Sequence, residues 1–411
     1  MTFDPAGIAA LDARDPLRGF RDEFQLREGL IYLDGNSLGA RPRATAARIA
    51  AAVTEEWGEG LIKSWLDAGW STAPLRIGDK IASLIGARPG EVIAADSTSV
   101  NIFKALAAAI SLRPDRTVIL SESTNFPTDV YMMQGIEAFS GGRIKAVRAD
   151  PEAVLDRLDA DVAVLLLTQV HYKSGLVRDM AEVTRRAQQA GALVVWDLSH
   201  SAGAMEVDLN GARADFAVGC GYKYLNGGPG APAFLFVAER NQAAMPVLSG
   251  WFGHASPFAF EEDYRPAGGI SRFQCGTPPV LGLAALECGI DLLLRADIRE
   301  MREKSLRLSQ LFIERMELRC AEFGFEPVFP ADPKLRGSQV AYAHPHGYEI
   351  VQALKERDVI GDFRAPDILR FGLAPLYLRH ADIVDAVERL HEVCLSRAWD
   401  KPEYRLRAAV T

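Results

Sequence analysis

Short apolar runs separated by helical segments dominate the middle of the chain. Residues 91–95, 117–120, 143–147, 162–168 and 193–196 are such runs, and most are followed by a polar loop and a stretch with helical character. The run 162–168 is almost entirely apolar, as in a strand that is buried on both faces. This alternation of strands and helices predicts an α/β fold with a mostly parallel central sheet and helices on both faces.

The second half of the chain follows a different pattern. A long helical region is predicted over about 280–322, and a smaller α/β domain follows it. Its strands are predicted near 325–329, 338–343, 358–362 and 368–372, and its helices near 347–357 and 380–397. We therefore expect an N-terminal segment, 1–50, that packs with the small domain, a large domain, 51–283, and a small C-terminal domain, 284–411.

Length, charge and cysteine content narrow the possible functions. A chain of 411 residues exceeds one ordinary core, and a net charge of −8 argues against a nucleic-acid partner. The five cysteines include no CxxC pair, so we expect free thiols in a reducing cytoplasm and no metal site. The N-terminus lacks the apolar core of a secretory signal, and no run approaches the ~20 apolar residues of a membrane span.

The stretch 191–237 carries the main candidate chemistry. The apolar run 193–196 ends on Asp197, His200 follows three positions later, and the run 216–220 leads into Lys223. A lysine for a Schiff base and a carboxylate that keeps a pyridine nitrogen protonated are what pyridoxal phosphate (PLP) requires. A solvated surface lysine is the competing interpretation. Lys173 is a rival for the Schiff base, although it has no paired Asp.

Further candidate residues follow predicted strands, on the same side as Asp197 and His200. Ligands of parallel sheets bind at the carboxyl ends of the strands. The residues on that side are Thr98, Phe126, Asp129, Thr168, Asp197 and His200. Thr98 and Ser99 begin a predicted helix, so they either hold a phosphate or simply cap the helix. His200 is either a capping or core residue or a contact of the cofactor ring. Arg370 binds a substrate carboxylate or forms a surface ion pair.

Several motifs together resemble the kynureninase family of fold-type-I PLP enzymes, in the class V aminotransferase group. They are WDLSHSAGA at 196–204, GCGYKYLNGGPGAP at 219–232, YLDGNSLG at 32–39, FPTD at 126–129, GWFGH at 250–254 and FQCGTPP at 273–279. The resemblance covers nearly the whole chain. It implies the fold-type-I PLP-dependent transferase fold and a homodimer whose active sites lie at the subunit interface.

The resemblance also implies a role for each site residue. Lys223 would carry PLP, Asp197 would contact the pyridine nitrogen with Asp129 close by, and Phe126 would stack on the ring. Thr98, Ser99 and Tyr222 would hold the phosphate, and Thr168 and His200 would contact the cofactor. Trp251 and Thr277 would complete the site from the second subunit. Arg370 would bind the substrate carboxylate, with Trp65 and Gly276 as further substrate contacts.

The implied reaction is hydrolysis of L-kynurenine to anthranilate and L-alanine by cleavage of the Cβ–Cγ bond, as in tryptophan degradation. Lys223, Asp197 and Tyr222 would be the catalytic residues, with Tyr222 as an acid or base. Trp65 and Thr277 replace the His and Asn of the animal enzymes, which resembles the bacterial type that prefers L-kynurenine over 3-hydroxykynurenine. The alternatives are a related lyase such as a cysteine desulfurase, which needs a mobile catalytic cysteine, and a PLP-binding protein without catalysis.

Overall fold

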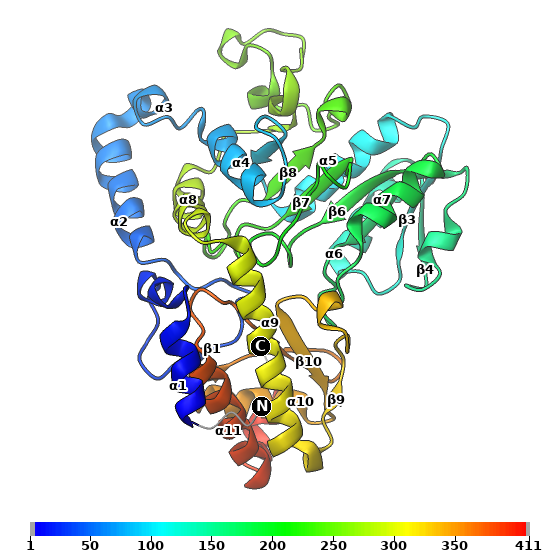
Figure 1. The fold of residues 1–411 in the computed structure, drawn as a ribbon. Coiled ribbons are helices and arrows are strands. Elements are labelled where there is room, and N and C mark those ends of the chain that lie inside the picture. Colours follow the sequence, from blue (N-terminus) through cyan, green and yellow to red (C-terminus); the bar gives the residue numbers. More distant parts are fainter. Residues whose placement is uncertain (1–4, 408–411) are drawn as a thin grey trace.

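The computed structural model describes residues 5–407; residues 1–4 and 408–411, which belong to the expected N-terminal segment and C-terminal domain, lie outside it. A seven-stranded sheet forms the centre of its upper half, with strand order β2-β8-β7-β6-β5-β3-β4 (Figure 1). The strands are β2 (Val92–Ala94), β3 (Val118–Glu122), β4 (Lys145–Ala149), β5 (Val162–Thr168), β6 (Leu193–Asp197), β7 (Phe216–Gly219) and β8 (Phe234–Val237). Strands β3 to β7 run parallel and β8 pairs antiparallel with both β2 and β7, which confirms a mostly parallel sheet.

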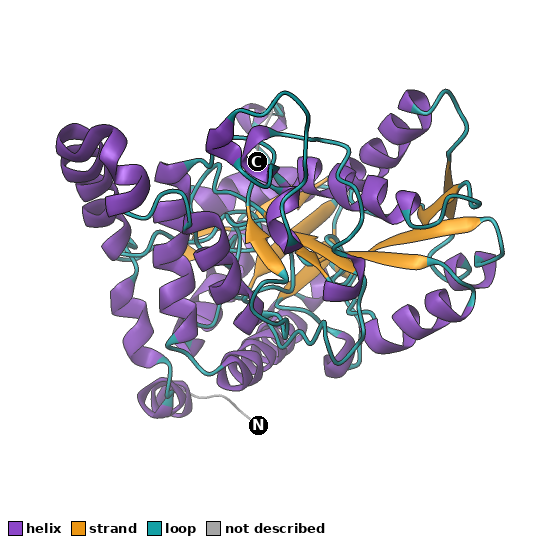
Figure 2. Cartoon of the chain, turned by 90° about the horizontal axis from the view of Figure 1, so that it is seen from above, coloured by secondary structure: helices purple, strands orange, loops and turns teal. Residues whose placement is uncertain are grey.

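Helices cover both faces of this sheet, as Figure 2 shows. They include α4 (Ala73–Leu84), α5 (Thr98–Ser111), α6 (Pro127–Phe139) and α7 (Met180–Gln189). The apolar run of β5 explains the two layers, because successive side chains of a strand point to opposite faces. Leu165 and Leu167 belong to one core cluster, whereas Val164 and Leu166 belong to the other.

The segment before α4 changes its helical type several times. Helix α2 (Ala44–Ala51) widens into a π-helix, Ala52–Gly60, in a stretch that contains two helix-weakening glycines. A 3-10 helix, Leu61–Lys63, and the short α3 (Ser64–Asp67) follow. Between β4 and β5 the chain forms a short 3-10 helix, Val154–Arg157.

The lower half of the molecule is a smaller α/β unit. Helix α8 (Val280–Leu294) leads into α9 (Ile298–Arg319), with Asp297 capping the second helix. The sheet beside α9 has the order β12-β13-β10-β9. Its strands are β9 (Glu326–Pro327), β10 (Gln339–Ala343), β12 (Asp362–Arg364) and β13 (Ile368–Gly372), and its other helices are α10 (Gly347–Lys355) and α11 (His380–Leu395).

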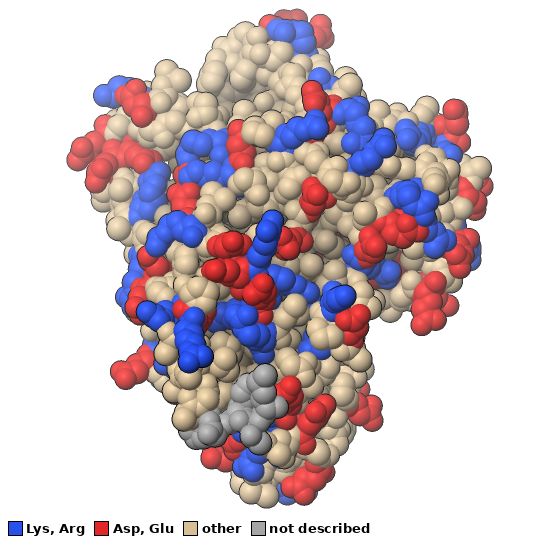
Figure 3. Space-filling model, viewed as in Figure 1, with Lys and Arg blue, Asp and Glu red and all other residues tan. Residues whose placement is uncertain are grey.

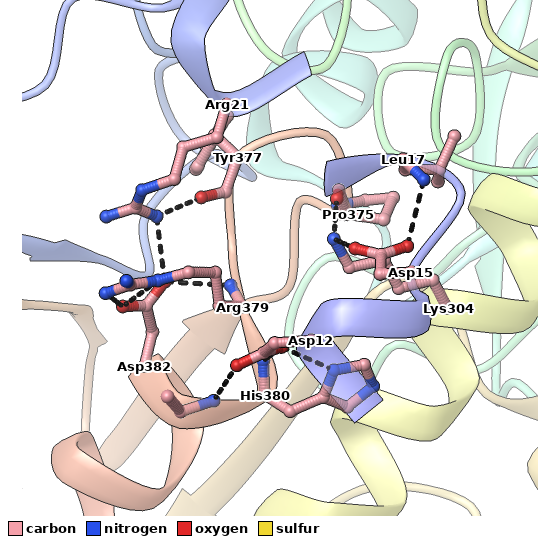
Figure 4. Close-up of polar contacts among 11 residues, drawn as sticks. Asp12, Asp15, Leu17, Arg21, Lys304, Pro375, Tyr377, Arg379, His380 and Asp382 are labelled. Carbon is pink, nitrogen blue, oxygen red and sulfur yellow. Dashed lines mark hydrogen bonds and ion pairs between the residues drawn. The ribbon is translucent and has the colours of Figure 1, made fainter. Parts of the chain in front are cut away.

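The N-terminal segment is attached to this lower unit. Strand β1 (Ile31–Tyr32) pairs in parallel with β11 (Val359–Ile360), and α1 (Pro5–Arg14) lies against α11. Three polar contacts add to these (Figure 4): a hydrogen bond between Asp12 and His380 (2.8 Å), and the ion pairs of Asp15 with Lys304 (2.6 Å) and of Arg21 with Asp382 (2.8 Å). The Asp15–Lys304 pair is almost fully buried, and Lys304 also donates to the carbonyl of Pro375.

Charges of both signs are interspersed on the face shown in Figure 3. Among the helices of residues 5–407, none is long and apolar enough to cross a membrane. The same part of the chain holds no group of three or more His, Cys, Asp or Glu residues placed to bind a metal ion.

Candidate active site

Lys223 lies in a cavity at the carboxyl end of the central sheet. Its strand, β7, ends at Gly219, and a tight turn carries the lysine into the cavity. The Nζ atom of Lys223 is 2.9 Å from Nε2 of the buried His200. Burial, followed by the charge of Lys223, holds the pKa of His200 well below its usual value. The imidazole is therefore neutral and accepts a hydrogen bond from the lysine.

Two buried carboxylates face the same cavity. Oδ1 of Asp197, at the end of β6, accepts hydrogen bonds from the backbone N–H and the hydroxyl of Ser199, at 2.8 and 2.6 Å. Oδ1 of Asp129 is buried without a hydrogen-bond partner. Burial and then the charge of Asp197 raise the pKa of Asp129 well above normal, and burial also raises the pKa of Asp197. The pair therefore favours a cationic or N–H-bearing ligand.

The N-terminus of α5 forms another wall of the cavity. Ser97 caps the helix, and Thr98 and Ser99 line the cavity in its first turn. The hydroxyl oxygen of Thr98 is buried and has no hydrogen-bond partner. A helix N-terminus with a free hydroxyl suits a phosphate, because the first N–H groups of a helix are unpaired and carry the positive end of its dipole.

Aromatic residues complete the walls. The ring of Phe126 has Nζ of Lys223 5.7 Å from its centroid and packs edge-on against Tyr172, with 5.2 Å between centroids. Tyr222 precedes the lysine, and burial, followed by the charges of Cys220 and Asp197, raises the pKa of its phenol. Its hydroxyl is thus protonated at neutral pH and can donate a proton or a hydrogen bond.

The structure brings together nine of the residues expected from the sequence. Thr98, Ser99, Phe126, Asp129, Thr168, Asp197, His200, Tyr222 and Lys223 all line the one cavity. Thr128, Tyr172 and Ser199 also line it and were missed. Each directly neighbours, or lies within four residues of, a predicted site residue, so the strand-end rule itself was the signal for them.

Four expected residues lie elsewhere in this single chain. Trp65 and Thr277 share an apolar pocket with Trp57, Trp70 and the start of α8. Trp251 packs against Phe252 and Phe258, and Gly276 adjoins Thr277 in the loop before α8. None of the four lines the cavity of Lys223 among the described residues. Trp65 and Thr277, the two positions expected around the substrate's aryl ring, do lie together.

Arg370 lies beside the cavity and is already paired. Its Nε is 2.8 Å from Oδ1 of Asp362, its second terminal nitrogen contacts Oδ2 of that carboxylate, and it also donates to the carbonyl of Tyr172 and to the hydroxyl of Ser37. Arg364 lies 2.8 Å from the same carboxylate. Although burial opposes it, the hydrogen bonds and charge of Arg370 hold the pKa of Asp362 below normal.

Arg370, Asp362 and Arg364 form a charged cluster, and Asp34 belongs to it. It is buried, and its Oδ1 has no hydrogen-bond partner. Burial, followed by the negative charge of Asp362, raises the pKa of Asp34 to about 7. Ser37, Asp34, Asp362 and Arg364 were not predicted as site residues. The sequence gives a partial signal, because Asp362 and Arg364 stand two positions apart and so share one face of a strand.

Lys173, the rival for the Schiff base, has its amine bonded outside the cavity. Its Nζ donates to the carbonyl of Ala365 at 2.9 Å, and it does not line the cavity of Lys223.

The cavity fits PLP. The unpartnered oxygen of Asp129 and the carboxylate of Asp197 suit a protonated pyridine nitrogen, and the unpartnered hydroxyl of Thr98 suits the phosphate. Lys223 is the one lysine among the lining residues, so the position of an aldehyde-binding amine is also defined.

Comparison with known proteins gives a consistent result. Residues 301–390 match the family model of the kynureninase C-terminal domain. A kynureninase from Burkholderia pseudomallei (strain K96243) is 51% identical over 408 residues, covering 98% of each chain. A kynureninase from Pseudomonas fluorescens is 48% identical over 408 residues, again covering 98% of each chain.

Solved structures share the fold at low sequence identity. A cysteine desulfurase from Thermococcus onnurineus NA1 aligns with a TM-score of 0.77 and 18% identity, over 93% of this chain and 99% of that one. A cysteine desulfurase from Escherichia coli aligns with a TM-score of 0.75 and 21% identity, over 92% and 99%. These matches confirm the α/β fold and, at such identity, carry nothing about the cofactor or the substrate.

Proposed function

The chain belongs to the kynureninase family, and on this premise we propose how its own residues perform the reaction of that family. It is a PLP-dependent hydrolase that converts L-kynurenine and water into anthranilate and L-alanine. The single observation that supports the residue assignment best is the meeting of Lys223, Asp197 and the N-terminus of α5 in one cavity.

We assign the cofactor contacts as follows. Asp197, with Asp129 beside it, holds the pyridine nitrogen, while Thr98, Ser99 and Tyr222 hold the phosphate. Phe126 covers one face of the ring, and Thr168 and His200 are further contacts. When bound, PLP supplies an electron-withdrawing ring that stabilises negative charge at the substrate Cα and accepts the electrons released when Cβ–Cγ breaks.

Lys223 is the residue that moves the first proton. Its Nζ would remove the proton from the substrate Cα. Neutral His200 can accept a hydrogen bond from this amine without competing for its proton, because its own pKa is held low. It therefore orients Nζ.

Tyr222 is assigned to the later proton transfer, to Cβ, after the Cβ–Cγ bond breaks. The oxygen of water becomes part of the anthranilate carboxylate, and Cβ of the alanine fragment must gain a proton. The raised pKa of the Tyr222 phenol keeps its hydroxyl protonated, so it can supply or relay that proton.

The substrate is an α-amino acid, and we assign its carboxylate to Arg370. Trp65, Gly276 and Thr277 are assigned to the aryl ring. Trp65 and Thr277 share an apolar pocket, which suits the unsubstituted ring of L-kynurenine better than a hydroxylated one.

A cysteine desulfurase is not favoured. The relatives that match 98% of the chain at 48–51% identity are kynureninases, and Cys320 and Cys394 are buried, 1% and 5% exposed.

We also propose a homodimer in which each subunit completes the other's site. Large apolar side chains are exposed on two segments: Trp57, Leu61, Ile62 and Leu66 on one, and Met245, Val247, Phe258 and Phe260 on the other. The contact between Trp65 and Phe252, with 5.6 Å between ring centroids, joins the two segments. Exposed apolar surface of this extent is typical of a subunit interface. A partner seated there would bring Trp251, Gly276 and Thr277 toward a second cavity.

A cytoplasmic location is the accompanying proposal. It rests on the five cysteines, which are all free and three of which are buried, as is usual in a reducing compartment.

The test is a product assay on purified protein loaded with PLP. Adding L-kynurenine should release fluorescent anthranilate and L-alanine in equal amounts. Protein that binds PLP and releases neither product would disprove the substrate assignment and leave the cofactor assignment intact.

A further inference from the structure

The charged cluster beside the cavity contains one more cation than a single carboxylate-binding arginine requires. Asp362 and Arg370 are direct partners across the antiparallel strands β12 and β13. Arg364 lies two residues after Asp362 on the same strand, so its side chain leaves the same face of the sheet. Both guanidinium groups contact Asp362 and the hydroxyl of Ser37.

Arg370 has little capacity left for a substrate. Its contacts to Asp362, Ser37 and the Tyr172 carbonyl use four of the five N–H groups of a guanidinium. Its side chain is 1% exposed. It therefore offers one N–H, which is too few for the bidentate contact that arginine usually makes with a carboxylate.

Arg364 has more capacity and is more accessible. Its side chain is 32% exposed, and its hydrogen bonds go to the hydroxyl of Ser37 at 3.2 Å and to the carbonyl of Phe363 at 3.0 Å. Together with the Asp362 contact they leave two N–H groups, counted among the described residues. The carbonyl of the next residue, Ala365, accepts a hydrogen bond from Lys173.

The charge balance favours one further anion. Two guanidinium groups face Asp362, which is ionised, and Asp34, whose pKa of about 7 leaves it largely protonated below neutrality. Below neutrality the two guanidinium groups therefore outnumber the ionised carboxylates, and Lys355 is a further basic residue near Asp34 and Asp362. Both arginines also act on the cavity, since their charges help to lower the pKa of His200.

We propose that Arg364 is a second residue that binds the α-carboxylate of the substrate, and that Asp362 is a positioning residue for both guanidinium groups. The substrate carboxylate bridges the two arginines: it accepts one hydrogen bond from the free N–H of Arg370 and others from the free N–H groups of Arg364. This inference rests on the proposed function, in which the substrate is L-kynurenine.

The experiment compares Arg364→Gln, Arg364→Lys and Arg357→Gln, each loaded with PLP. Arg357 is the matched control, because it lies in the same domain and donates to the carbonyl of Ala353 in the preceding helix. The ligands are L-kynurenine, measured as substrate, and its α-carboxamide, measured as competitive inhibitor. The amide keeps the aryl ketone and the amine and lacks only the negative charge.

Arg364→Gln should raise KM for L-kynurenine about ten- to a hundredfold, with kcat changed less than about threefold, because a bond made in the ground state is lost. The inhibition constant of the carboxamide should change less than about twofold. Arg364→Lys should give an intermediate KM, since it restores the charge without the planar fork. Arg357→Gln should behave as the unmodified protein.

Equal losses for the acid and the amide would overturn the proposal, because they would show a general structural effect. An unchanged KM in Arg364→Gln would overturn it as well. If Arg364→Gln loses its cofactor absorbance, the same acid-to-amide comparison in Arg364→Lys decides the matter. If the unmodified protein releases no anthranilate while the amide still binds, the proposed function has failed, and the acid-to-amide binding ratio still tests Arg364.

Discussion

Nζ of Lys223 and Nε2 of His200 lie 2.9 Å apart, and the imidazole is the acceptor because burial keeps it neutral. The lysine amine is thus held by an uncharged partner inside the cavity.

The two candidate lysines make opposite predictions. Lys223→Ala should abolish the visible absorbance of protein-bound PLP and lower anthranilate formation by about a thousandfold or more, because the amine acts directly on the reacting atoms. Lys173→Ala should retain the absorbance. Absorbance spectra and product assays of the two variants check this. Loss of the band in Lys173→Ala alone would show that Lys173, not Lys223, binds PLP.

Thr98 offers a test of the phosphate site. Its hydroxyl is buried without a partner, so Thr98→Val should leave the stability of the PLP-free protein unchanged or slightly higher. The same change should weaken PLP binding about tenfold, since one hydrogen bond to a charged phosphate is lost. Equilibrium dialysis of PLP and thermal melting of the PLP-free protein measure the two effects, and unchanged PLP affinity would remove Thr98 from the site.

Gly39 is constrained by close approach of the backbone. A Cβ there would lie 2.1 Å from the carbonyl oxygen of Lys223 and 2.5 Å from Oδ1 of Asn226. Gly39→Ala should therefore displace the turn that carries Lys223, costing about 1–3 kcal/mol of stability by overpacking and weakening PLP binding. Gly19→Ala, where nothing lies within 4 Å, is the control. Melting curves with and without PLP distinguish the two variants.

Asp34 predicts how substrate binding changes with pH. Its pKa is raised to about 7, so it is protonated below neutrality and gains a negative charge above it. That charge lies close to Arg364 and Arg370, so KM for L-kynurenine should rise as pH increases from 7 to 9. Asp34→Asn stays neutral and should flatten this rise. A KM profile that is identical in both proteins would contradict the assignment.

The same residue predicts a change in stability with pH. The folded pKa of Asp34 lies above the unfolded value near 3.8, so the fold prefers the protonated form. The contribution of the protonated Asp34 to the free energy of unfolding is full below about pH 4 and is lost as the pH rises to about 7. Asp34→Asn should therefore gain in melting temperature relative to the unmodified protein between pH 4.5 and pH 8.

The exposed apolar segments predict the oligomeric state. Leu66 is 81% exposed, and Leu66→Asp should weaken the homodimer by placing a charge in a buried interface. Leu318→Asp is the control, because Leu318 is 70% exposed on α9, away from both segments. Sedimentation velocity should show a dimer for the control and a larger monomer fraction for Leu66→Asp. Equal behaviour of the two variants would show that Leu66 is not in the interface.

The sequence was sufficient for the cavity of Lys223 because one rule of parallel sheets governs it. Asp197, Thr168 and Thr98 come from distant positions, yet each follows a strand or begins the next helix, and these points converge at one edge. The charged cluster obeys no such rule. Ser37 and Asp362 are more than 300 positions apart and meet only because β1 pairs with β11, two strands of two residues each.

The attachment of the N-terminal segment to the small domain has a consequence for folding during synthesis. The residues that pair with Asp12, Asp15 and β1 lie at positions 304–380, so these contacts cannot form until that later part of the chain has been synthesised. These contacts have very large sequence separation and therefore form late. The central sheet can assemble before them, whereas Ser37 reaches Asp362 only after β11 and β12 have been synthesised.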